Sequence, residues 1–194
     1  MIPSYITHYH LRDRQPFLSL SELDLKEQQI FDELLVRHQT DPGYRRRYGQ
    51  NYLVSRKAVE AALRARFIER GGKPARKYPF YFVLGKSTWF QYLNENQSEI
   101  RILLKDLNPA TASFTFPDSY VSLSSKTEPY HGKVFLLDEL ESFVAEYGLP
   151  NDDTSLNYER YWLGSFEKYL EVQIWEDEIV QPFIDRFRED AMAS

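Results

Sequence analysis

The chain has 194 residues, of which 42% are hydrophobic, 15% are aromatic and none is cysteine. A chain of this size can bury a substantial core and needs no second domain, so we expect a single domain over residues 1–194. The lack of cysteine excludes disulfides, thiolate metal sites, iron–sulfur clusters and cysteine nucleophiles. No secretion signal and no membrane-spanning run stand in the sequence, which predicts a cytoplasmic protein without membrane contact.

The net charge of −5 hides a strong segregation of charge along the chain. Residues 37–77 contain 12 lysines and arginines against 3 acidic residues, a balance of +9. Residues 138–190 contain 15 acidic residues against 4 basic ones, a balance of −11. Two interpretations are open: the charges lie on solvated helix faces, with the two segments facing each other, or the basic segment is a phosphate-binding surface.

The first half of the chain predicts one strand and two helices. β-Branched and aromatic residues over positions 4–11 favour a strand. A helix follows, capped by Ser21 or Asp24 and ended by the turn at residues 41–43. Residues 51–70 form the clearest helix, and two glycines at 71–72 end it. The region of residues 37–77 is therefore expected to be basic and largely helical.

The second half of the chain changes to strands separated by short helices. Strands are predicted at residues 78–84, 99–104, 112–116, 133–136 and 169–175, and helices at 89–93 (or a turn), 138–147 and 179–188 (or a turn). The polar stretch at residues 151–155 predicts a surface loop. This irregular alternation predicts an α+β domain with a mixed, mostly antiparallel sheet and flanking helices.

Two histidines, His8 and His10, have the spacing that places both side chains on one side of a strand. Three roles are open for them: hydrogen bonding inside a half-buried strand, contact with a substrate, or metal binding. A zinc site needs a third ligand, and no companion motif such as H-E-x-x-H is present in the sequence. We therefore expect no metal.

Glu171 is the acidic residue of most interest because it stands among apolar residues in the last predicted strand. A strand would hold a carboxylate rigidly at the wall of a cleft. The alternative is a carboxylate on the solvated face of an amphipathic strand. Gln173 is expected beside Glu171 in either case.

The basic segment interleaves arginine with tyrosine, as surfaces that bind phosphates and bases do. Its candidate nucleic-acid-binding residues are Arg45, Arg46, Arg47, Arg56 and Lys57. This pattern predicts, as one of two functional hypotheses, a non-catalytic protein that binds nucleic acid or an acidic protein partner through residues 45–70.

The order of the motifs along the chain resembles the ADP-ribosyltransferase fold, and within it the toxins that modify DNA bases (the DarT type). Residues 6–11 followed by 16–18 look like the opening strand of that family, and residues 170–175 look like the strand that carries its catalytic glutamate. Residues 78–82 with 89–92 are similar to its second aromatic block, and residues 100–107 and 113–115 to its middle strands.

This resemblance implies an NAD-dependent ADP-ribosyltransferase with NAD as co-substrate. Glu171 would be catalytic, His8 or else His10 would hold the adenosine ribose, and Tyr81 would pack on nicotinamide. Arginines would bind the pyrophosphate bidentately. Many arginines of this chain compete for the position of the family's phosphate-binding arginine, and the basic residues 37–77 would be an insertion.

Overall fold

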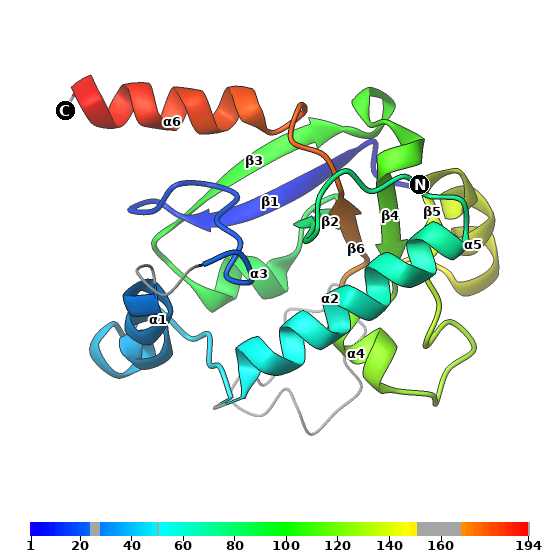
Figure 1. The fold of residues 1–194 in the computed structure, drawn as a ribbon, viewed down its shortest axis with the longest axis horizontal. Coiled ribbons are helices and arrows are strands. Elements are labelled where there is room, and N and C mark those ends of the chain that lie inside the picture. The colour runs from blue at the N-terminus through cyan, green and yellow to red at the C-terminus, as the bar shows by residue number, and fades with distance from the viewer. Residues whose placement is uncertain (24–27, 50, 151–167, 194) are drawn as a thin grey trace.

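The computed structural model describes residues 1–23, 28–49, 51–150 and 168–193 (Figure 1). Its centre is a six-stranded sheet with the strand order β3-β1-β2-β6-β4-β5. The strands are β1 (Tyr5–Leu11), β2 (Phe80–Leu84), β3 (Gln97–Leu103), β4 (Ala112–Thr115), β5 (Phe135–Leu136) and β6 (Glu171–Ile174). All five pairings between them are antiparallel, and the expected α+β class is confirmed.

Helices flank the sheet on both faces. They are α1 (Gln28–Thr40), α2 (Tyr52–Glu69), α3 (Thr88–Leu93), α4 (Ser119–Ser124), α5 (Leu140–Tyr147) and α6 (Gln181–Ala193), with short 3₁₀ turns η1 (Leu104–Asp106), η2 (Pro109–Thr111) and η3 (Leu137–Glu139). In Figure 1, α2 passes diagonally across the β6 and β4 half of the sheet, while α6 extends along the other side of the view. The sheet therefore lies between two helical layers.

Helix α2 closely matches its predicted range of residues 51–70, and apolar packing and a glycine fix its C-terminal end. Leu63 and Phe67 are fully buried, and the Phe67 ring stacks on Trp175 with 5.8 Å between centroids. Gly71 follows the helix with a φ of +94°, a conformation that a residue with a side chain rarely adopts. The glycine stop predicted from the sequence is confirmed.

The two faces of the sheet differ in chemistry. Side chains alternate between the faces of a strand, so the register assigns each one. Val83 pairs with both Thr7 and Glu171, which places these residues on one face, the face that α2 covers. The opposite face is apolar: its buried residues include Ile6, Phe82, Phe114 and Val172, which pack against Phe143 of α5 and Ile184 of α6.

Strands β1 and β2 separate after two residue pairs. They are paired only at Ile6 with Leu84 and at Thr7 with Val83. Beyond that point β1 continues to Leu11 alongside β3, while β2 continues alongside β6. The sheet therefore splits at its middle, and the split opens toward the end of β1.

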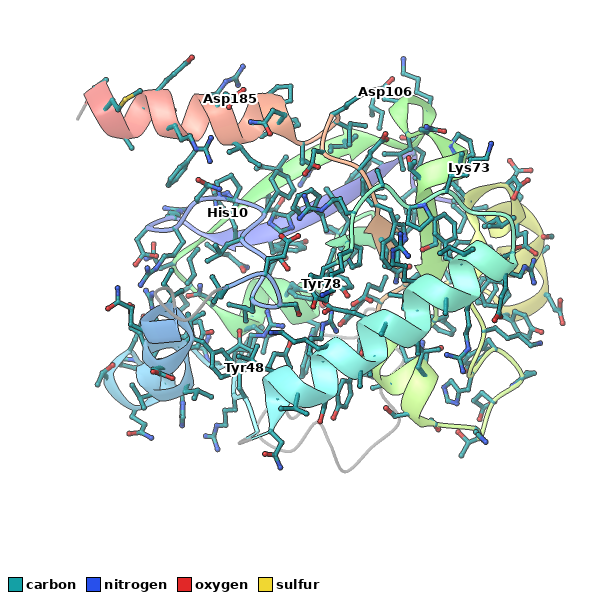
Figure 2. All side chains as sticks on the ribbon, in the orientation of Figure 1. His10, Tyr48, Lys73, Tyr78, Asp106 and Asp185 are labelled. Carbon is teal, nitrogen blue, oxygen red and sulfur yellow. The ribbon has the colours of Figure 1, made fainter. Side chains whose placement is uncertain are left out.

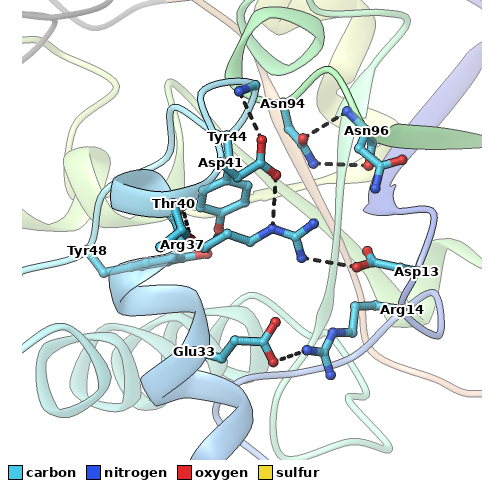
Figure 3. A network of polar contacts seen from close by, with 11 residues as sticks. Asp13, Arg14, Glu33, Arg37, Thr40, Asp41, Tyr44, Tyr48, Asn94 and Asn96 are labelled. Atoms are coloured by element: carbon cyan, nitrogen blue, oxygen red, sulfur yellow. Dashed lines mark hydrogen bonds and ion pairs between the residues drawn. The ribbon is translucent and has the colours of Figure 1, made fainter.

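Helix α1 is tied to the loop that follows β1 by ion pairs (Figure 3). Arg37 donates to Asp13 at 3.2 Å and to Asp41 at 3.3 Å, and Arg14 pairs with Glu33. The segment after α1 joins α3 through a bridge between Tyr44 and Asn94. These contacts hold residues 41–49 beside the open end of the split, where residues 44–49 form one wall of the cavity described below.

Several elements differ from the sequence predictions. Helix α4, which follows the strand predicted at residues 112–116, was not predicted; it forms because the Asp118 carboxylate accepts from the amides of Tyr120 and Val121 and caps it. Helix α6 is a full helix to Ala193 rather than a short one. The basic region 37–77 includes the irregular residues 41–49, so only part of it is helical. The cap at Asp24 and the loop at 151–155 lie outside the described residues.

Candidate functional site

A cavity of about 950 Å³ opens beside the split of the sheet. This volume lies in the range of ligand-binding sites, roughly 300–1,000 Å³. Its walls come from both ends of the chain: β1, the wall at residues 44–49, α2, β2, the start of α4 and β6. His8, His10, Tyr81 and Glu171, which the sequence singled out, all line it.

Glu171 lies at the start of β6, on the sheet face that α2 covers. Its side chain is 6% exposed, which excludes the alternative of a carboxylate on a solvated face. Oε1 accepts from the Ser119 amide at 3.0 Å and from Gln173 Nε2 at 3.1 Å. One oxygen of the carboxylate is therefore fixed within a buried network at the cavity wall.

Gln173 extends this anchor into the core. Its Nε2 also donates to Thr115 Oγ1 at 3.0 Å, and its Oε1 accepts from Ser113 Oγ at 2.8 Å. Ser113 Oγ in turn accepts from Trp175 Nε1 at 2.9 Å. Buried polar networks whose members are satisfied hold a single geometry. This chain of hydrogen bonds fixes the position of Glu171, and it confirms Gln173 as its neighbour.

Glu60, Arg56 and Tyr81 form a second buried cluster in the cavity wall. Glu60 Oε1 accepts from Arg56 Nε at 3.1 Å and from the Tyr81 hydroxyl at 2.9 Å. The Arg56 guanidinium also lies over the Tyr81 ring, 4.0 Å from its centroid. Burial, together with the charges of Glu60 and Glu171, raises the pKa of Tyr81 well above its ordinary value although Arg56 opposes this. Tyr81 therefore remains a proton donor to Glu60.

Asp118 supplies a second carboxyl group near Glu171 and is 7% exposed. Burial, and then the charge of Glu171, raises the pKa of Asp118 to about 6. The Tyr120 and Val121 amides oppose that change because they donate to the ionised form. At neutral pH this carboxyl is poised close to its titration range, which suits proton transfer.

His8 lies on the other face of the sheet from Glu171, since Thr7 shares the Glu171 face and side chains alternate. Both of its ring nitrogens are used: Nδ1 bonds the Tyr81 carbonyl at 2.8 Å, and Nε2 accepts from the Phe17 amide at 3.1 Å. Phe17, at a φ of +60°, stacks on the imidazole with 4.2 Å between centroids. Burial lowers the pKa of His8 to about 4. His8 is therefore neutral near pH 7 and connects β1 to β2 across the split.

His10 is better placed than His8 to meet a ligand. It lines the cavity, and among the described residues its Nδ1 bonds the Leu11 carbonyl at 2.9 Å while its Nε2 has no hydrogen-bond partner. Figure 2 labels His10 and Tyr48, which line this cavity from β1 and from the segment before α2. Among the described residues, no three His, Asp or Glu side chains gather in a way that could hold a metal ion.

The five candidate basic residues do not form one surface. Arg46, Arg47 and Arg56 line the cavity, and the first two are exposed. Arg45 donates to Glu95 at 2.5 Å and to the Tyr92 carbonyl at 2.8 Å, and Lys57 lines a separate shallow hollow on α2. The structure thus brings three of these residues to the cavity and leaves two outside it.

Glu60 and Asp118 are site residues that the sequence reasoning missed. The spacing of Arg56 and Glu60, one helical turn apart, would have indicated a pair on one face of α2. An aspartate directly after Pro117 would have indicated a possible helix cap at Asp118. Neither pattern reveals that the pair faces a cavity, because that depends on how α2 packs on the sheet.

No described helix is both long enough and apolar enough to cross a membrane. Comparisons with protein-family models, with curated proteins and with solved structures gave no match for this chain.

Proposed function

We propose that this protein is an NAD-dependent, ADP-ribosyltransferase-like enzyme that cleaves the bond between nicotinamide and ribose. The observation that carries the proposal is Glu171, a buried carboxylate fixed at the wall of a cavity large enough for a dinucleotide. Cleavage of this glycosidic bond builds positive charge on the ribose. A fixed carboxylate beside that ribose stabilises the transition state electrostatically.

The other cavity residues supply binding and proton transfer. Tyr81 offers an aromatic face next to the Glu171 strand, and Arg46 and Arg47 offer guanidinium groups to the pyrophosphate. Asp118, with its raised pKa, is suited to accept a proton from the nucleophile that receives ADP-ribose. His10 takes the role of ribose contact, because both nitrogens of His8 are engaged within the protein.

The test is Glu171→Gln, compared with Glu178→Gln, which changes an exposed residue just beyond the same strand. We expect the wild-type protein to bind NAD in titration calorimetry and to release nicotinamide, measured by chromatography. Glu171→Gln should bind NAD within a few-fold of wild type and release nicotinamide about 10²–10³-fold more slowly, while the Glu178 variant behaves as wild type. Wild-type protein that does not bind NAD, or a Glu171 variant with full activity, contradicts the proposal.

A second candidate function is binding without catalysis. The exposed guanidinium groups of Arg46 and Arg47 favour it, because such groups also suit the phosphates of a nucleic acid or the carboxylates of an acidic protein. Under this function, retention on DNA or RNA would fall steeply with salt, and NAD would leave the melting temperature unchanged.

A further inference from the structure

Glu60 has one satisfied and one unsatisfied oxygen. Oε1 accepts from both Arg56 and Tyr81, whereas Oε2 is buried and has no hydrogen-bond partner among the residues that the structure describes. The residue is 1% exposed, and it lines the cavity. Buried carboxylate oxygens are rarely left without a donor, because the group has lost its water. An orphaned oxygen at a cavity wall therefore points to a donor that arrives with the ligand.

We propose that Glu60 Oε2 accepts a hydrogen bond from the nicotinamide half of NAD, either from the carboxamide N–H or from a hydroxyl of the adjoining ribose. The inference rests on the proposed function. Glu60 is assigned to the nicotinamide half of NAD because it is hydrogen bonded to Tyr81. Tyr81 lies on the same sheet face as Glu171, on the neighbouring strand. Glu60 thus becomes a residue that determines which ligands the cavity accepts.

The surroundings of Glu60 hold its free oxygen in one position. Arg56 and the Tyr81 hydroxyl both bind Oε1, and the cation–π contact between Arg56 and Tyr81 closes the cluster. A carboxylate oxygen only accepts, so a ligand that presents an acceptor or a negative charge at this point would be rejected. Sites built to pair one donor discriminate strongly against analogues that lack it.

The decisive variant is Glu60→Gln. Its amide oxygen can still accept from Arg56 and Tyr81, which turns the –NH₂ group toward the position of Oε2, where it opposes the ligand donor. We expect NAD affinity, measured by titration calorimetry, to fall about tenfold to one hundredfold. Glu178→Gln is the matched control, because it makes the same chemical change at an exposed position. Circular dichroism and thermal unfolding verify that each variant is folded.

Two further arms separate the possible donors. If the carboxamide is the donor, Glu60→Gln weakens the binding of free nicotinamide and leaves the binding of ADP-ribose unchanged. If the ribose hydroxyl is the donor, Glu60→Gln weakens the binding of ADP-ribose and leaves the binding of free nicotinamide unchanged. On wild-type protein, nicotinic acid adenine dinucleotide lacks the carboxamide N–H, and an NAD analogue without ribose hydroxyls on the nicotinamide side lacks the other donor. One of the two should bind at least tenfold more weakly than NAD.

The outcomes distinguish this inference from the function on which it rests. Wild-type protein that binds no NAD overturns both. Wild-type protein that binds NAD, with Glu60→Gln binding equally well, overturns the role of Glu60 alone and leaves a water molecule as the partner of Oε2. Should the variant fail to fold, equal affinity of wild-type protein for NAD and for both analogues overturns the role of Glu60 in the same way.

Discussion

His8 shows how one side chain can matter to the site without meeting the ligand. Nδ1 bonds the Tyr81 carbonyl across the split, and Nε2 accepts from the amide of Phe17 in the loop after β1. The second of these bonds needs an unprotonated Nε2 as acceptor. Protonation of His8 therefore removes one bond and places a charge beneath the stacked Phe17 ring. The geometry at the mouth of the split should depend on a neutral imidazole.

This arrangement predicts a dependence of stability on pH. The pKa of His8 is about 4 in the folded protein, below the ordinary value of 6.5. Its contribution to stability is complete above pH 6.5 and is lost as the pH falls from 6.5 to about 4, because the unfolded chain takes up the proton first. Between pH 7 and 4 the loss reaches up to about 3 kcal/mol. Urea unfolding of wild type and of His8→Gln over this range measures it.

The comparison with the variant is needed because Asp118 acts in the opposite direction. The pKa of Asp118 is raised to about 6, so its contribution is complete below its ordinary value of 3.8 and is lost as the pH rises through 6. The two slopes partly cancel in the wild-type protein. The stability advantage of wild type over His8→Gln should still shrink as the pH falls, and parallel curves would refute the neutral state of His8.

At the scale of elements, the packing of α2 on the sheet determines the position of Arg56 and Glu60. Leu63 and Phe67, which follow Glu60 on α2, pack against Trp175 in one buried cluster. Gly72 lies directly against this contact: a Cβ built at that position would be 2.3 Å from Phe67 Cε2. Position 72, just beyond the end of α2, therefore needs glycine, because a side chain there would collide with the Phe67 ring.

We expect Gly72→Ala to destabilise the protein by about 1–3 kcal/mol, because the methyl group must displace a fully buried ring. Gly49→Ala is the control, since a Cβ there would meet no atom of the described residues within 4 Å, and its effect should be within about 0.5 kcal/mol. Urea unfolding of both variants provides the measurement. Equal stability of the two variants would show that the Phe67 contact is looser than described.

Elements with a local signal were predictable from the sequence, and those fixed by distant contacts were not. Strand β1 and helix α2 follow from alternation and from the glycine stop. Helix α4 was missed because six residues carry little periodicity, and its cap at Asp118 follows a proline turn. The family resemblance placed Tyr81 and Glu171 in one site, and both line the cavity. No signal in the sequence indicated the split of the sheet, and the alternation of side chains along β1 puts His8 on the other face.

For the whole molecule, ion pairs between distant segments offset part of the segregation of charge along the sequence. Basic residues of the segment 37–77 pair with acidic residues from elsewhere: Arg70 with Glu139 at 2.6 Å, and Arg76 with both Glu22 and Asp177. The two segments do face each other in part, as one interpretation held. Arg46 and Arg47 differ from these, since both are exposed at the cavity.

The last prediction uses this difference to separate catalysis from nucleic-acid binding. If the cavity binds NAD, the double variant Arg46→Gln with Arg47→Gln should weaken NAD binding about tenfold or more, through lost contacts to the pyrophosphate. Arg45→Gln should leave it unchanged, because Arg45 is turned to Glu95 and Tyr92 outside the cavity.

If the segment instead binds nucleic acid by charge, Arg45→Gln, Arg46→Gln and Arg47→Gln, each made singly, should weaken retention by a similar factor, because each removes one positive charge near the phosphates. Titration of all variants with NAD and with a DNA oligonucleotide at two salt concentrations measures both effects. A loss of NAD binding confined to the double variant supports the enzyme. Equal, salt-dependent losses on DNA without any response to NAD support the binding protein, because electrostatic attraction to phosphates does not depend on which wall of the cavity an arginine occupies.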